Sequence, residues 1–345
     1  MSNTGNTGNT GNTGNTGNTG NAGINGDVGG GWILPDRADF PFVMETYPIL
    51  GNPPGRISDL RRRVYIRDTT IGGQRKTVEF RTLPYPNGNI ARFHDRNWTG
   101  RWYAWRVLRE FTAARWTGKT WNTRALNDAL AQKLLDVYAP VGQGSTIQEI
   151  EWETLLAMAR DERASALGEI LTQDVEFITA FMEALAITPG SHYRTFRMLH
   201  IASLIGSFAA LHYKHVFDRP RPSWELPALM PPIPVPGHSS FPSGHATQAH
   251  LMAKCMGLVF DLAIPVLAHK TALRETLNAL ARRVARNREI AGLHYPSDSD
   301  AGEHIASHVL DRLRTLSASD EAATAYGPFA TFDVALNAAV EEWRP

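Results

Sequence analysis

The chain has 345 residues, 43% of them hydrophobic, and a formal net charge of +1 at pH 7. That length allows one large core or two domains. The near-neutral charge excludes the broad cationic surface that nucleic acids and anionic membranes require, so we expect no nucleic-acid partner and only local basic chemistry.

Residues 1–30 are dominated by an Asn-Thr-Gly repeat that runs from Asn3 to about Asn21. Such a composition buries too little apolar surface to offset the entropy of ordering, so we expect a disordered tail. The chain shows no secretory signal, and its single cysteine, Cys255, cannot form an internal disulfide. These features predict a cytoplasmic location.

Residues 31–100 are rich in Pro and Gly and predict an irregular N-terminal segment that wraps the rest. One hairpin is expected within it, with strands at 63–67 and 76–81 joined at Gly72-Gly73. The basic run Arg61–Arg63 beside this hairpin is interpreted as a solvated edge.

Residues 101–345 show helical periodicity and predict an all-α bundle that forms the catalytic domain. Helices are expected near 101–116, 123–138, 146–163, 168–187, 191–217, 244–262, 269–291 and 299–317. The stretch Leu199–Tyr213 lacks charged residues, which predicts a central helix. It and Leu251–Leu267 are the most apolar segments, but both are short, so no transmembrane helix and no integral membrane association are expected.

The end of the helix at 191–217 carries the first candidate cations, Lys214 and Arg221. Pro220 and Pro222 force the chain into an extended exit after the helix. Taken alone, Lys214 is equally well explained as a lysine that interacts with the negative end of the helix dipole.

The segment Pro242-Ser243-Gly244-His245 leads directly into an apolar helix. A helix N-terminus offers unpaired N–H groups to an anion, Gly244 permits close approach of the backbone, and Ser243 adds a hydroxyl. The alternative is an ordinary helix start capped by Ser243.

Arg288 continues the apolar stripe of the helix at 269–291, so an anion should meet it; a buried carboxylate partner is the alternative to a ligand. The helix should end at Gly292 and leave His294 on a loop. Asp298 can bond one ring nitrogen of His294, which frees the other nitrogen to attack phosphorus or to bind a metal. Asp298 can also serve simply as a helix cap.

Together these segments resemble the type 2 phosphatidic acid phosphatase and vanadium haloperoxidase superfamily. Its three-part signature is matched in order by Lys214 to Arg221-Pro222, by Pro242–His245, and by Arg288, His294 and Asp298. One position departs from the pattern, because Asn287 stands where the family usually has Ser. The signature covers about 85 residues, and the helical content is similar to the family from roughly residue 100 onward.

The resemblance implies that Lys214, Arg221 and Arg288 hold the oxygens of phosphate or vanadate, with help from Ser243 and the Gly244 N–H. In a phosphatase, which needs no cofactor, His294 attacks phosphorus and His245 protonates the leaving oxygen of a phosphate ester. In a haloperoxidase, His294 is the ligand of a vanadate cofactor, and the substrates are a halide and hydrogen peroxide. An oligomer is compatible with either interpretation.

His238 favours the haloperoxidase interpretation, because the family's bromoperoxidases are similar in placing a His at this position. The run His294-Tyr295-Pro296-Ser297-Asp298 instead resembles the family's phosphatases. We therefore expect a haloperoxidase, with a soluble acid phosphatase as the alternative. A non-catalytic scaffold that keeps a phosphate site is a third hypothesis.

Overall fold

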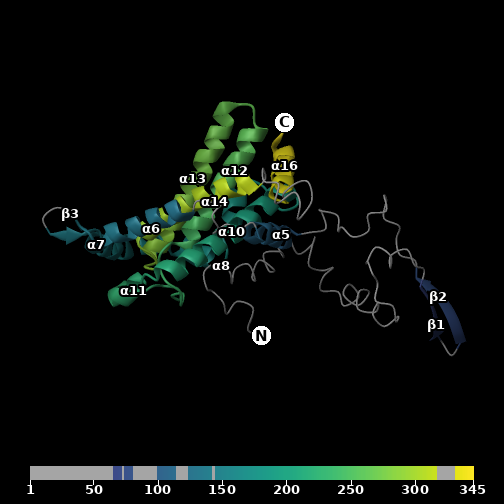
Figure 1. Ribbon diagram of the computed structural model, residues 1–345, viewed down its shortest axis with the longest axis horizontal. Helices are drawn as coiled ribbons and strands as arrows, with labels where there is room; N and C mark the ends of the chain where they lie inside the picture. Colours follow the sequence, from purple (N-terminus) through teal and green to yellow (C-terminus); the bar gives the residue numbers. More distant parts are fainter. Residues whose placement is uncertain (1–64, 72–73, 81–98, 114–122, 142–143, 317–330) are drawn as a thin grey trace. The chain divides into compact units, whose positions relative to one another are not determined.

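The protein is described by a computed structural model over residues 65–71, 74–80, 99–113, 123–141, 144–316 and 331–345 (Figure 1). The predicted tail, residues 1–30, lies outside this part of the chain, and so do most of the segment 31–100 and the run Arg61–Arg63. The chain divides into two compact units: Val28–Thr99 forms one, and Met1–Asp27 with Gly100–Pro345 forms the other.

The described part of the first unit is a two-stranded hairpin of β1 (Tyr65–Ile71) and β2 (Gln74–Phe80). The strands are antiparallel, with Ile71 opposite Gln74, while the Gly72-Gly73 pair predicted to join them lies outside the described residues. The first predicted strand ended too early, and the second began too late. The first strand runs on through Thr69, Thr70 and Ile71, whose β-branched side chains favour extended backbone.

The second unit is helical, which confirms the predicted all-α class. It contains α5 (Gly100–Ala113), α6 (Thr123–Tyr138), α7 (Ile147–Asp161), α8 (Arg163–Val175), α9 (Ile178–Ala184), α10 (Tyr193–Phe217), α11 (Pro222–Glu225), the 3-10 turn η5 (Pro227–Leu229), α12 (Gly244–Ala263), α13 (Leu267–Ile290), α14 (Pro296–Leu316) and α16 (Thr331–Trp343). Two short strands, β3 (Pro140–Val141) and β4 (Ser145–Thr146), pair beside α7. Within the described ranges, no helix is both long and apolar enough to cross a membrane.

The predicted helix 168–187 is wrong, because the chain breaks there into α8 and α9. Glu176 adopts an extended conformation, with φ −166° and ψ 159°, which ends α8. Its carboxylate then accepts the N–H groups of Ile178 and Thr179, so it satisfies the first donors of α9. The helices α11 and α16 were not predicted, and α14 begins at Pro296 rather than near 299 because proline suits a first helical position.

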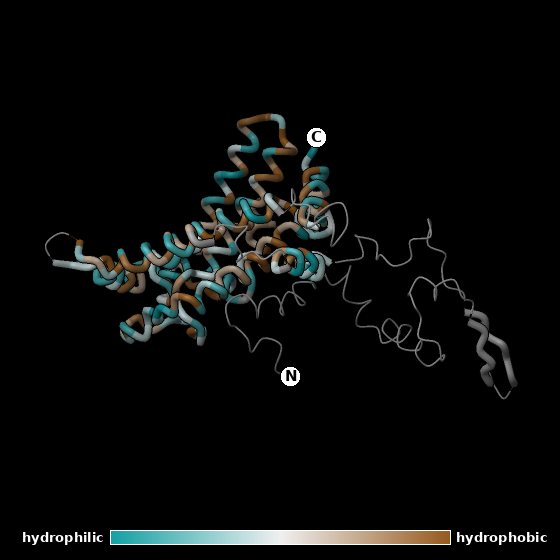
Figure 2. Tube along the Cα trace, viewed as in Figure 1, coloured by the Kyte–Doolittle hydropathy of each residue, from teal (hydrophilic) through white to brown (hydrophobic). Residues whose placement is uncertain are grey.

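Helix α12 lies at the centre of the helical unit and packs against α10, α13, α14 and α16. Along α12 and α10 the apolar residues are brown in Figure 2, and most of both helices is buried. The uncharged stretch Leu199–Tyr213 is thus central, as its composition predicted. Burial of the large aliphatic and aromatic side chains stabilises such a core by roughly 1.5–3 kcal/mol each.

Two glycines let the neighbouring helices approach the first turns of α12. A Cβ on Gly206 of α10 would lie 3.0 Å from the Gln248 Cα atom. A Cβ on Gly302 of α14 would lie 2.8 Å from the Ser243 carbonyl oxygen and 2.9 Å from the Thr247 nitrogen. Since backbone cannot yield to such contacts, these glycines set the distance between α12 and both neighbours.

The loop between α13 and α14 begins with a left-handed residue, Gly292, at φ 77°. Its N–H donates to the Glu289 carbonyl at 2.7 Å, and the Leu293 N–H donates to the Arg288 carbonyl at 3.0 Å. This pair of bonds is a Schellman motif. A hydrophobic cluster from α7, α8 and η5 packs against Leu293 and Tyr295. This packing holds the backbone of His294, the residue between them, in place.

We predict that Gly302→Ala destabilises the protein, because the new methyl group meets backbone of α12. The expected loss is about 1–3 kcal/mol in the free energy of unfolding, measured by denaturant titration. Gly257→Ala is the matched control, since its Cβ would meet only the Arg274 side chain, at 3.6 Å. Equal midpoints for the two variants would contradict this account of the α12–α14 contact.

Candidate active site

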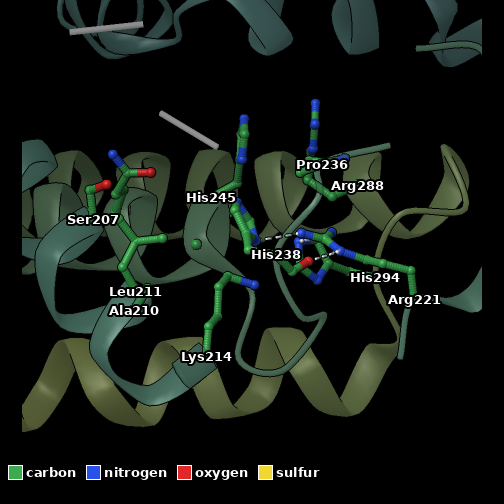
Figure 3. Close-up of a pocket in the computed structure, with 12 residues that line it drawn as sticks. Ser207, Ala210, Leu211, Lys214, Arg221, Pro236, His238, His245, Arg288 and His294 are labelled. Carbon is green, nitrogen blue, oxygen red and sulfur yellow. Dashed lines mark hydrogen bonds between the residues drawn. The ribbon is translucent and has the colours of Figure 1, made fainter. Parts of the chain in front are cut away.

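The signature residues meet at one cavity between α10, α12 and the segment 288–294 (Figure 3). Its lining comprises Ser207, Ala210, Leu211, Lys214, Arg221, Pro236, His238, Gly244, His245, Gln248, Arg288 and His294. Two candidates, Ser243 and Asp298, lie outside the lining and are completely buried. Residues up to 80 positions apart along the chain therefore share one polar cavity.

Lys214 reaches the cavity from the last turn of α10. The helix stops because Asp218 takes a left-handed conformation at φ 41°, ahead of the two prolines. The ammonium donates to the carbonyls of Ser239 and Ser240 at 2.8 and 2.7 Å. Burial, and then the charge of Arg221, hold the pKa of Lys214 well below its usual range.

Arg221 precedes α11 and spans the cavity wall. It donates to the carbonyls of His238 and Leu293 at 3.0 and 2.8 Å and to His294 Nε2 at 3.1 Å. Burial, and then the nearby Arg288 charge, lower the pKa of Arg221 to about 10 against the opposing charge of Asp298. It stays protonated at neutral pH, and its bonds go to uncharged groups.

Arg288 has one of the two partners that the sequence left open, a carboxylate. One guanidinium nitrogen, Nη2, donates to Asp174 Oδ1 at 3.0 Å, so a carboxylate partner exists. Nε and Nη1 are buried and have no hydrogen-bond partner within the described chain. An arginine at the edge of a cavity with two unsatisfied donors is suited to bind an oxyanion.

His294 is held between an acid and a cation. Its Nδ1 bonds Asp298 Oδ2 at 3.1 Å, while Nε2 faces Arg221 Nη1 at 3.1 Å. Since an ionised carboxylate only accepts, the proton sits on Nδ1 and the lone pair on Nε2. Burial, with Arg221 and Lys214, holds the pKa of His294 well below its usual range, so the ring is neutral and nucleophilic.

Asp298 itself is kept ionised. Burial opposes its charge most strongly, but Arg219 at 2.8 Å together with the His294 and Ser240 contacts outweighs burial and lowers the pKa of Asp298. Ser240 Oγ donates to Oδ2 at 2.5 Å, and the Tyr295 N–H donates to it at 3.0 Å. Asp298 thus bonds the histidine ring as foreseen, but it is not the N-cap: it is the third residue of α14, which begins at Pro296, and its carboxylate accepts the N–H of Tyr295, just before the helix.

Arg219 and its partners were not foreseen. This arginine is fully buried, bonds Glu151 Oε2 at 3.0 Å as well as Asp298, and lies 3.7 Å above the Tyr295 ring. Its position two residues before Arg221, in the run Asp218-Arg219-Pro220-Arg221-Pro222, was the available signal. Glu151 lies on α7 and gave none.

His245 is on the first turn of α12 and lines the cavity. Its Nε2 donates to the Gln173 carbonyl at 3.2 Å, and Phe177 stacks on the ring with centroids 5.2 Å apart. Burial, with Arg288 and His294, holds the pKa of His245 well below its usual range. The ring is neutral until an anion enters.

His238 lines the same cavity rather than the outer surface. Arg221 Nη2 donates to its Nδ1 at 2.9 Å, so the proton sits on Nε2, which is buried and has no protein partner in the described residues. Burial, with Lys214 and Arg221, lowers the pKa of His238 to about 4. Neutral His238 thus offers one N–H to a ligand.

Ser243 and Gly244 have different roles. Gly244 lines the cavity, while the Ser243 hydroxyl accepts the Ala246 N–H at 3.3 Å and caps α12. The simple capping alternative therefore describes the observed contact of Ser243. Its N–H donates to the Asp298 carbonyl at 2.9 Å, which ties the start of α12 to the start of α14.

These features describe a helical unit with a cavity lined by three cationic side chains, Lys214, Arg221 and Arg288, and by three histidines, His238, His245 and His294. The described residues contain no group of three or more His, Cys, Asp or Glu placed to hold a metal ion. Residues 196–310 match the family model described as the PAP2 superfamily.

Two curated relatives, from two strains of Mycobacterium tuberculosis, are each named decaprenylphosphoryl-5-phosphoribose phosphatase. Each is 28% identical over 132 residues, which is 38% of this chain and 66% of the relative. The chain thus spans slightly less than two thirds of their length, and both relatives are phosphatases by name.

We predict that Arg219→Met destabilises the protein by roughly 3–5 kcal/mol, because it leaves Glu151 and Asp298 buried without their cation. Denaturant titration at pH 7 measures the loss. Arg274→Met is the matched control, since it breaks an exposed pair with Asp261 and should cost about 1 kcal/mol or less. Similar losses in both variants would show that the buried triad is not a main support of the site.

Proposed function

We propose that this protein is a phosphatase that hydrolyses phosphate monoesters through a phosphohistidine at His294. The observation that carries the proposal is the neutral His294, whose Nε2 faces a cavity lined by Lys214, Arg221 and Arg288. The names of the relatives support a phosphatase rather than the haloperoxidase that His238 led us to expect. Their substrate name suggests an ester of an aliphatic alcohol for this chain as well.

In the first step, His294 Nε2 attacks phosphorus, and a P–N bond forms as the P–O bond to the leaving group breaks. His245, protonated on both ring nitrogens beside the bound ester, gives its Nδ1 proton to the leaving oxygen, so an alcohol departs. Lys214, Arg221 and Arg288 neutralise the charge on the three non-bridging oxygens, which is greatest in the trigonal-bipyramidal transition state. Asp298 stabilises the positive charge that develops on the His294 ring.

In the second step, water attacks phosphorus and His245 takes its proton. The P–N bond breaks, inorganic phosphate forms and neutral His294 returns. The neutral state of His245 before the ester binds follows from its burial and from Arg288 and His294. A bound phosphate dianion supplies the negative charge that favours the protonated ring.

A vanadate-dependent haloperoxidase is the second candidate, favoured by the unpaired Nε2–H of His238 in the cavity. The residues fit orthovanadate, because Arg288 offers two unpaired donors and His294 one lone pair. His294 would bind vanadium, while Lys214 and Arg221 would hold its oxygens. Bound vanadate supplies the activation of hydrogen peroxide for halide oxidation.

We expect His294→Ala to lower phosphatase activity by at least about a thousandfold, since no other group replaces the nucleophile. Release of inorganic phosphate from an alkyl phosphate and from p-nitrophenyl phosphate measures this. Arg283→Ala, which removes an exposed ion pair with Glu169, is the control and should retain full activity. Turnover by His294→Ala close to that of the natural sequence would rule out the phosphohistidine.

We expect orthovanadate to inhibit phosphate-ester hydrolysis without creating bromide oxidation in the presence of peroxide. Both activities are measured on one preparation, with and without orthovanadate. If bromide oxidation grows instead, His238→Ala should reduce it and spare ester hydrolysis. That result would replace the phosphatase with the second candidate.

A further inference from the structure

The C-terminal turn of α8 contacts the active site through Asn287, the residue before Arg288. Asn287 is buried, and its amide nitrogen donates to Glu169 Oε2 and to Gln173 Oε1, each at 2.9 Å. Both acceptors lie on one face of α8, one helical turn apart. Both N–H groups of the Asn287 amide are thereby hydrogen-bonded.

The same residue of α8, Gln173, holds the ring of His245. Its backbone carbonyl accepts from His245 Nε2 at 3.2 Å. That carbonyl is free because Glu176 is extended, so α8 ends before a later N–H can bond it. Phe177, two residues past the end of α8, stacks on the His245 ring.

A second side-chain pair joins α8 and α13 next to the pair of Asn287 and Gln173. Asp174, which follows Gln173, bonds Arg288, which follows Asn287, at 3.0 Å. The two side-chain pairs fix both the distance and the rotation of the α8 end relative to α13. The direction of the Gln173 carbonyl is therefore set by contacts to α13.

We infer that Asn287 is a positioning residue for the general acid, acting through Gln173 to keep one His245 proton on Nε2, so that Nδ1 is the nitrogen that takes up the second proton beside the bound ester and gives it to the leaving oxygen. This inference rests on the proposed phosphatase function. Serine, which the family usually has before Arg288, is too short to reach both Glu169 and Gln173. The amide at this position thus adds a constraint on His245 in this chain.

This role of Asn287 predicts that the activity lost in its variants depends on the leaving group of the ester. An alkoxide is a poor leaving group and needs a proton from His245, whereas p-nitrophenolate departs readily without one. A variant with a misplaced acid should therefore lose activity on alkyl phosphates selectively. A variant with weakened phosphate binding, or with a general loss of structure, should lose activity on both esters alike.

The test compares the natural sequence with Asn287→Ser and Gln173→Ala, the second of which keeps the carbonyl but removes the amide contact. Arg286→Ala is the matched control, because it removes an exposed ion pair between α13 and Glu162 that involves neither Glu169 nor Gln173. We expect Asn287→Ser to lower kcat/KM for an alkyl phosphate about tenfold and that for p-nitrophenyl phosphate less than about twofold, since general acid catalysis contributes about 10²–10⁴. Gln173→Ala should repeat this pattern, and orthophosphate inhibition should be unchanged in both.

A second measurement does not depend on activity. ¹⁵N NMR of the histidine rings, with the His245 signals identified from a His245→Gln variant, should show the proton on Nε2 in the natural sequence. Asn287→Ser should give a mixture of tautomers. Equal losses on the two esters, or an unchanged His245 tautomer in Asn287→Ser, would overturn the inference. If the natural sequence hydrolyses neither ester, the proposed function fails, and the tautomer measurement still decides the role of Asn287.

Discussion

The buried carboxylate of Asp298 is the constraint on which the rest of the site depends. Its oxygens bind the His294 ring, the Ser240 hydroxyl and the Arg219 guanidinium, and its carbonyl accepts the Ser243 N–H. These partners come from three separate segments: Arg219 from the first part of the signature, Ser240 and Ser243 from in or beside the second, and His294 from the third. An ionised group without solvent must have such partners, so the same interactions that keep it charged also bring the segments together.

The distribution of charge separates structural cations from binding cations. Arg219 has two carboxylate partners, Glu151 and Asp298, and does not line the cavity. Lys214 and Arg221 line it and bond carbonyls and histidines, while Arg288 has one carboxylate partner and two unsatisfied donors. The positive charge of the cavity is thus left largely unbalanced by the protein, which suits a phosphate dianion.

The cavity is built mainly from the ends of helices. Lys214 lies in the last turn of α10, Gly244 begins α12, and Arg288 lies in the last turn of α13. Helix ends leave backbone groups unpaired, and here the free carbonyl of Gln173 accepts from the His245 ring. The tight contacts of Gly206 and Gly302 with α12 keep these ends at fixed distances, so little movement is needed to order the site.

The sequence by itself determined the helical class, the central uncharged helix and the candidate residues from Lys214 to Asp298, because periodicity and short-range spacing are local properties. It did not reveal Glu151, Gln173 or Asp174, nor the break of the predicted helix 168–187 at Glu176. These residues contact the site from α7 and α8, more than 60 positions away along the chain, and such contacts leave no period in either segment. Only the tertiary structure decided which cations are neutralised and which nitrogen of each histidine carries the proton, since both depend on partners that packing brings within hydrogen-bond distance.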